Sequence, residues 1–119
     1  ATLHKACSGD ATAVSTRQVL HMATLGGARA LGAEKDLGSL EKGKRADFIR
    51  VETGSVHALP LFDKITHLVY STNRQDVRDV FVGGRRVVHD RRITTLDTDK
   101  LKEEIKRLAP RIAASLKEQ

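Results

Sequence analysis

The stretch GSLEKGKRADFIRVE, residues 38–52, combines a turn signal and a strand signal within one short segment. Gly43 stands among charged residues, and glycine adopts the positive φ angles of tight turns without steric cost. The apolar run that starts at Phe48 and Ile49 has the composition of a β-strand. Successive side chains of a strand point to opposite faces, so both faces of this strand carry large apolar groups. We therefore predict a turn followed by a strand over residues 46–51 that is buried on both sides.

A β-hairpin is predicted downstream, around the pair Gly83 and Gly84. The valine-rich runs 80–82 and 87–88 flank this pair. A two-residue loop in which both residues accept positive φ angles favours the type I′ turn of a hairpin. Proline interrupts the region between the two strand signals, and residues 65–70 of that region are predicted to form a helix.

The segment before the glycine turn has the pattern of a helix. Ser15 followed by Gln18 has the spacing of a capping box, in which each side chain accepts a hydrogen bond from the backbone amide of the other residue. The glycine pair 26–27 is expected to interrupt the helix, because glycine is a poor helix former. Residues 28–31 then form a further turn, which Gly32 can close in the left-handed conformation.

A further helix is predicted near the end of the sequence, after the N-cap residue Asp97. Apolar residues recur there at spacings of three and four and form one stripe, made of Leu101, Ile105, Leu108, Ile112 and Leu116. Pro110 falls inside this pattern and is expected to kink the helix or to separate two helices. We expect this amphipathic helix to dock on a protein core or on another subunit.

Three collinear segments, residues 15–32, 38–52 and 67–88, resemble the metal-dependent amidohydrolase superfamily. The nearest branch contains methylthioadenosine/S-adenosylhomocysteine deaminases, guanine deaminases and chlorohydrolase-like enzymes. The resemblance implies an α+β chain that is the C-terminal fragment of a (β/α)8-barrel enzyme. The chain would divide into a remnant of the last barrel-side helices over residues 1–35, an accessory β-domain that is half of a composite sandwich over residues 36–96, and a terminal amphipathic helix over residues 97–119.

The resemblance also implies what chemistry to expect. Members of the superfamily hold a divalent metal with a His-x-His pair and further His and Asp residues, and no His-x-His pair occurs here. The histidines lack the spacing of a local metal site and are His4, His21, His57, His67 and His89. We therefore assign no catalytic, cofactor-binding or metal residue to this chain. The parent enzyme is expected to hold zinc or iron and to hydrolyse a C–N or C–Cl bond of a cyclic amidine such as a purine. The chain alone is expected to be inactive.

The expected partners follow from the same resemblance. A (β/α)8 barrel needs about 250 residues, and this chain has 119. The chain is therefore expected to need the barrel and the N-terminal strands of its parent, or to self-associate through exposed strand edges or helix faces. It shows no signal-peptide pattern and no long apolar run, so we expect no membrane contact and a cytoplasmic location. The single Cys7 is interpreted as an incidental thiol.

The net charge of +6 raises nucleic-acid binding as an alternative function. Many of the basic residues are interleaved with acidic ones, and the few aromatic residues form no ladder for base stacking. If the chain did bind nucleic acid, the contact residues would be Arg85, Arg86, Arg91 and Arg92. A stand-alone interaction or assembly module is the other alternative to a part of an enzyme.

Four side chains with polar groups are interpreted as structural. Asp47 is expected to accept hydrogen bonds from backbone amides near the Gly43 turn, as aspartates at turns commonly do. His21 and His67 are expected to pack or to form hydrogen bonds, and Tyr70 to bury its ring and bond its hydroxyl.

Overall fold

The computed structural model describes residues 2–115 and leaves the side chain of His4 aside. Residues 1 and 116–119, which include Leu116 of the predicted stripe, lie outside the described part. The helical elements are α1 Thr2–Ser8, α2 Thr16–His21, the π-helical η1 Met22–Gly26, α3 Gly27–Ala30, the short 3₁₀ turn η2 Val56–Ala58, α4 Lys64–Tyr70, the 3₁₀ turn η3 Arg74–Asp76, and α5 Thr98–Ser115. The strands are β1 Phe48–Val51, β2 Val77–Val82, β3 Arg85–His89 and β4 Arg92–Ile93.

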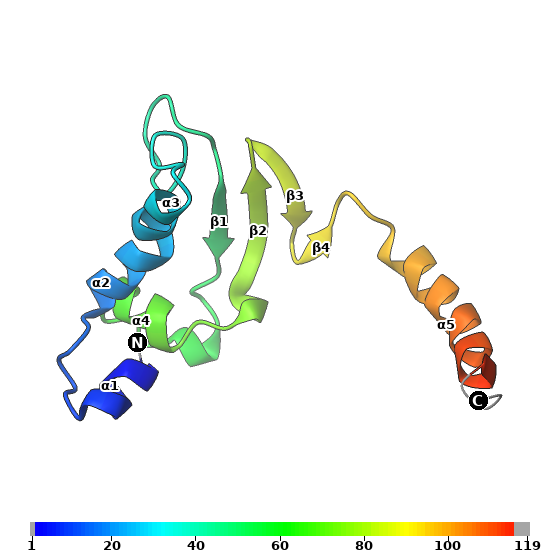
Figure 1. Ribbon diagram of the computed structural model, residues 1–119, viewed down its shortest axis with the longest axis horizontal. Coiled ribbons are helices and arrows are strands. Elements are labelled where there is room, and N and C mark those ends of the chain that lie inside the picture. The colour runs from blue at the N-terminus through cyan, green and yellow to red at the C-terminus, as the bar shows by residue number, and fades with distance from the viewer. Residues whose placement is uncertain (1, 116–119) are drawn as a thin grey trace.

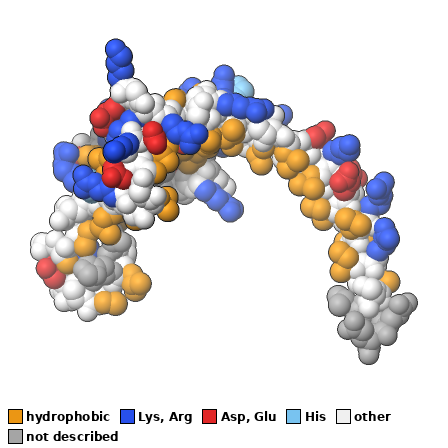
Figure 2. Space-filling view, turned by 45° about the horizontal axis from the view of Figure 1, so that its top comes forward, with side chains coloured by type: hydrophobic (Ala, Val, Ile, Leu, Met, Phe, Trp, Pro, Cys, Tyr) orange, Lys and Arg blue, Asp and Glu red, His pale blue; other side chains and the backbone are white. Residues whose placement is uncertain are grey.

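The chain is arched and open. Helices α1 to α4 lie beside one edge of the sheet, and α5 stands apart beyond the other edge (Figure 1). The radius of gyration is 19.8 Å, whereas a compact chain of this length has a radius of about 13.5 Å. Figure 2 shows hydrophobic side chains gathered along the concave side of the arch, from the sheet to α5. Much apolar surface is therefore uncovered within the described residues.

The four strands form one antiparallel sheet in the order β1-β2-β3-β4. Phe48 of β1 pairs with Phe81 of β2, and the centroids of their stacked rings are 4.4 Å apart. Gly83 and Gly84 join β2 to β3 with φ angles of 56° and 77°. Two consecutive positive φ angles are those of a type I′ turn, so the predicted hairpin is confirmed.

The hairpin turn is fastened to the segment just before β1. The amide of Gly84 donates a hydrogen bond to the carbonyl oxygen of Ala46 at 3.0 Å, and the amide of Gly83 donates to the carboxylate of Asp47. Asp47 thus accepts a backbone hydrogen bond, but the expectation that its donor lies near the Gly43 turn was wrong. The donor is 36 residues away in sequence and comes close only through the pairing of β1 with β2.

The helical stretch that begins with α2 continues through the glycine pair 26–27, where a break was expected. The capping box of Ser15 and Gln18 is present at the start of α2. Gly26 and Gly27 both have φ of −63°, in the right-handed helical region, so the predicted interruption at this pair was wrong. The chain widens into a π-helical turn instead, and a Cβ at Gly26 would lie 3.2 Å from the carbonyl oxygen of His21. Gly32 has the predicted left-handed conformation, with φ of 66°.

The core of the described residues is small. The buried apolar residues are Ala28 of α3 and Ala58 of η2. Ile49 on β1 is 52% exposed, so the predicted burial of both faces of this strand is not met within this chain. The loop after α3 packs closely on that helix, since a Cβ at Gly38 would lie 2.9 Å from the Cβ of Ala28.

Helix α4 confirms the helix predicted over residues 65–70, and the carboxylate of Asp63 caps it by accepting a hydrogen bond from the amide of Thr66 at 2.6 Å. The predicted burial of Tyr70 was wrong. Its ring is exposed, and the ammonium group of Lys5 lies 5.7 Å from the ring centroid.

Helix α5 begins as predicted, because the carboxylate of Asp97 accepts hydrogen bonds from the amides of Asp99 and Lys100. The helix runs without a break through Pro110, so the separation into two helices was wrong. Proline removes one amide donor and leaves the carbonyl of Lys106 without its helical partner. This part of the helix is exposed, so water can take up the freed carbonyl.

Candidate functional site

Strand β2 and the turn before it carry two buried carboxylates. Asp76 ends η3 and is 3% exposed, and Asp79 lies in the middle of β2 and is 2% exposed. Burying a charged group is unfavourable unless the group is paired and hydrogen-bonded. The partners of these two side chains therefore indicate what the residues do.

Asp79 binds side chains from both neighbouring strands. Its carboxylate oxygens lie 3.1 Å from the guanidinium of Arg50 on β1 and 3.0 Å from Nδ1 of His89 on β3. The amide of Asp90 donates a hydrogen bond to it at 3.2 Å, and the guanidinium of Arg86 lies 3.9 Å away. The hydrogen bond from His89, above all, holds the pKa of the Asp79 carboxyl below its usual value, with help from the Asp90 amide and Arg50. The carboxylate thus ties β1, β2 and β3 together.

Asp76 fastens two turns to each other. The amide of Asn73 donates a hydrogen bond to its carboxylate at 2.9 Å, and Nε2 of His57 lies 3.0 Å from the same group. The hydrogen bond from Asn73 is the main cause that lowers the pKa of the Asp76 carboxyl, followed by the one with His57. This pair joins η2, which carries His57, to η3.

A shallow polar pocket of about 500 Å³ opens beside the His57 and Asp76 pair. Its other walls include Glu52, Arg78 and Arg91. An aspartate that orients a histidine is a common arrangement for moving a proton. Here the polar groups are engaged with one another, since Arg78 binds Glu52 at 3.3 Å and also binds the carboxylate of Asp90. The pocket is therefore lined by a network of ion pairs that links the loop after β1 to β2.

The histidines do not converge. His57 and His89 contact different aspartates, His21 ends α2, and Nε2 of His67 is buried in α4 with no hydrogen-bond partner among the described residues. Among the side chains that the structure describes, no three from His, Cys, Asp and Glu form a group that could hold a metal ion. The described residues thus do not fit a resident metal, and we derive no catalytic step through one. The roles of His57 and His89 could not be found from the sequence, because their carboxylate partners lie 19 and 10 residues away.

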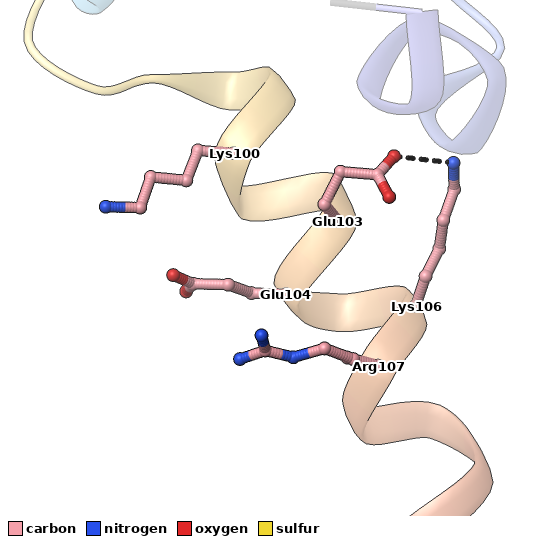
Figure 3. Close-up of a pocket in the computed structure, with 5 residues that line it drawn as sticks. All are labelled: Lys100, Glu103, Glu104, Lys106 and Arg107. Atoms are coloured by element: carbon pink, nitrogen blue, oxygen red, sulfur yellow. Dashed lines mark hydrogen bonds and ion pairs between the residues drawn. The ribbon is translucent and has the colours of Figure 1, made fainter.

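Five charged residues of α5 form a shallow depression on one side of that helix, and they are Lys100, Glu103, Glu104, Lys106 and Arg107. Figure 3 shows them projecting from a single helix, with Glu103 turned toward Lys106. The carboxylate of Glu103 and the ammonium of Lys106 are 2.9 Å apart. All five lining residues come from α5, so the depression is a solvated helix face. Among the described residues, no helix combines the length and the apolar character needed to cross a membrane.

An apolar hollow lies between α3 and the first two strands. It measures about 640 Å³, and its walls include Ala28, Leu31, Leu37, Ile49 and Val80. Leu31 and Ile49 are both exposed to solvent here. Its polar lining residues are Thr24, Ser39 and Asp47, and the rest of the lining is apolar or glycine, so its composition is mainly that of a surface for packing.

Comparisons with known proteins agree with the resemblance seen in the sequence. The sequence model of the amidohydrolase family matches residues 1–87. The chain is 43% identical over 109 residues to the 5-methylthioadenosine/S-adenosylhomocysteine deaminase of Syntrophobacter fumaroxidans, covering 92% of this chain and 25% of that protein. It is also 43% identical over 114 residues to the 5'-deoxyadenosine deaminase of Methanosarcina acetivorans, covering 96% of this chain and 26% of that protein.

A solved structure shares the fold. An adenosine deaminase from Xanthomonas campestris with bound zinc matches with a TM-score of 0.86 and 36% identity, over 95% of this chain and 26% of the other. The chain therefore spans about a quarter of the length of these relatives. The predicted fold class, an α+β segment from the C-terminal part of a barrel amidohydrolase, is confirmed. The chain belongs to the amidohydrolase family.

Proposed function

We propose that this chain is the C-terminal accessory part of a metal-dependent amidohydrolase that deaminates an adenosine derivative by hydrolysis. In this reaction the adenine ring gains a hydroxyl group from water in place of its amino group, and ammonia leaves. The two deaminases and the similar solved structure act, by their names, on adenosine-type compounds, which favours C–N hydrolysis over C–Cl hydrolysis. The single cysteine also suits a reducing, cytoplasmic compartment.

The proposed role of this part is architectural. The similar structure with bound zinc supports zinc in the whole enzyme, where a metal lowers the pKa of bound water. The buried carboxylates of this chain already have amide, histidine and arginine partners that tie strands and turns together. We therefore place the metal ligands and the catalytic groups in the part of the enzyme beyond this segment.

The observation that carries the proposal is the uncovered apolar surface beside β1. Ile49 and Leu31 stand exposed at the hollow between α3 and the sheet, and the outer edge of β1 has no partner strand among the described residues. Apolar area removed from water stabilises a protein by about 25 cal/mol per Å². An exposed edge strand also offers unpaired backbone groups to another strand. We infer that the barrel and the N-terminal strands of the same enzyme cover this surface.

A chimera tests the proposal. This chain replaces the corresponding quarter of the deaminase of Syntrophobacter fumaroxidans, and ammonia release is measured with 5′-methylthioadenosine, adenosine, guanine and a chlorotriazine, with chloride release as a second readout. We expect a folded, zinc-binding chimera that deaminates an adenosine derivative. A chimera that folds and binds zinc but releases no ammonia from any of these compounds contradicts the proposal.

A matched pair of variants tests the covering surface. Ile49→Arg places a charge at the exposed apolar position on β1, whereas Ile49→Val keeps the position apolar. In the chimera, Ile49→Arg should abolish folding and activity while Ile49→Val retains both. In the 119-residue chain alone, both variants should keep the circular dichroism spectrum of the parent, because Ile49 faces solvent there. Equal activity of the two chimeric variants shows that this surface is not an interface.

A further inference from the structure

Helix α5 presents an apolar stripe that the rest of the described chain leaves uncovered. Every residue from Leu101 to Ser115 is exposed. The stripe's members within the described residues are Leu101, Ile105, Leu108 and Ile112, which are between 40% and 58% exposed. An amphipathic helix this short is marginally stable alone and gains most of its stability from packing its apolar side. We therefore expect another protein surface to pack on the stripe.

The spacing of the stripe fits a second copy of the same helix. The four members that the structure describes are separated by 4, 3 and 4 residues, so this part of the stripe has the same pattern when read in either direction. Two copies packed antiparallel place Leu101 opposite Ile112 of the second copy, and Ile105 opposite Leu108. Each of these contacts occurs twice around the two-fold axis. The separations also match the alternation of core positions in a coiled coil.

The charges beside the stripe favour the antiparallel arrangement. Glu104 and Arg111 lie two turns apart on the same flank of the stripe. In the antiparallel pair, Glu104 of one copy lies within about 3 Å of the axial level of Arg111 in the other, because each residue rises 1.5 Å. Two ion pairs then form across the interface. Pro110 lies on the opposite side of the helix from the stripe, so it does not obstruct the contact.

A parallel pair does not have this complementarity. Parallel packing brings like positions to the same level, so Glu104 and Arg111 of opposite copies remain about 10 Å apart along the axis. The flank position that then faces Glu104 in the other copy is Ala109, which offers no charge. We propose that α5 is a self-association helix that joins two copies of this chain as an antiparallel two-stranded coil. With four apolar residues from each copy, the association is weak and depends on concentration.

Sedimentation over a series of concentrations tests the proposal on the full chain, in reducing buffer so that the exposed Cys7 forms no disulfide. The variants are Glu104→Arg, Arg111→Glu and the double variant with both changes. Each single variant loses two ion pairs, so its dissociation constant should rise about fivefold. The double variant restores both pairs with reversed signs, and its dissociation constant should return to that of the parent chain. Restoration is specific to the antiparallel register.

Leu108→Glu should disrupt the dimer more strongly than the charge variants do, because it places a charge within the apolar stripe. Because Leu108 is exposed and α5 stands apart from the sheet (Figure 1), the substitution leaves the sheet intact, which circular dichroism can verify. We expect this variant to be a monomer at every concentration. A dimer that survives Leu108→Glu lies on another surface, such as the edge of β1, and overturns the proposal. A parent chain that is monomeric throughout overturns it equally, and so does a double variant as weak as the single variants. These measurements require no enzymatic activity, so they stand independently of the proposed deaminase function.

Discussion

Gly38→Ala is expected to destabilise the chain strongly, and Gly43→Ala serves as its matched control. The two glycines have nearly the same backbone conformation, with φ of 90° and 94°. Placing an alanine in this region costs about 1 to 2 kcal/mol at either position. The surroundings differ, since a Cβ at Gly38 would lie 2.9 Å from the Cβ of Ala28 and 3.0 Å from the Cα of Leu25, whereas nothing lies within 4 Å of a Cβ at Gly43.

The steric contact adds to the backbone strain only at Gly38. Carbon atoms pack best at about 3.5 to 4.0 Å, and forcing an extra methyl group into a packed site costs about 1 to 3 kcal/mol. We therefore expect losses in the free energy of unfolding of about 2 to 5 kcal/mol for Gly38→Ala and about 1 to 2 kcal/mol for Gly43→Ala. Urea titrations followed by circular dichroism measure both. If the two losses agree within about 0.5 kcal/mol, the loop does not pack on α3 as described.

Three further predictions concern the hairpin, the buried carboxylates and the isolated chain. Gly84→Val should lower the free energy of unfolding by more than about 1 kcal/mol, since a β-branched residue tolerates positive φ poorly, and an unchanged melting midpoint would show that the turn is not of this type. The pKa values of the Asp76 and Asp79 carboxyls are lowered in the folded chain. The two ionised carboxylates therefore stabilise the fold fully above the ordinary aspartate pKa of 3.8, and this stabilisation is lost as the pH falls through the lowered values. Urea titrations between pH 6 and pH 2 should therefore show that the free energy of unfolding falls with acid, and that it falls less in Asp79→Asn than in the parent chain. A parent chain whose free energy of unfolding stays constant over this range contradicts the assignment. The 119-residue chain alone should release no ammonia from adenosine-type or guanine-type substrates and retain no stoichiometric zinc or iron after dialysis, and one tightly bound metal per chain would refute this.

Local signals account for the elements that the sequence predicts correctly. Gly83 and Gly84 form the turn that two adjacent glycines between valine-rich runs indicate, and Ser15 with Gln18 forms its capping box within four residues of chain. Asp97 likewise caps α5 through amides two and three residues ahead. In each case the partners are neighbours in sequence, so the pattern contains the whole interaction.

The errors arise where the interaction depends on tertiary structure. Asp47 bonds an amide that only strand pairing brings near it, and its local surroundings suggested the wrong donor. The partners of Asp79 come from two other strands, so neither the buried charge nor its pairs can be recognised from spacing. Gly26 and Gly27 stay helical although glycine is a poor helix former, and the π-helical turn Met22–Gly26 has no signal in the local sequence. The burial predicted for both faces of β1 fails because nothing in the described chain covers Ile49.

The bonds that fasten the hairpin turn to Ala46 and Asp47 make that turn a spectroscopic reporter. Amides at the tip of a hairpin normally face water and exchange their protons with solvent quickly. Here the amides of Gly83 and Gly84 donate to groups that immediately precede β1. Their exchange rates will therefore report the docking of β1, whereas the amides that pair β2 with β3 report the closing of the hairpin itself. The signals of these two glycines in a nitrogen-15 spectrum can thus be used to follow the pairing of β1 with β2, although β1 lies more than thirty residues earlier in the chain.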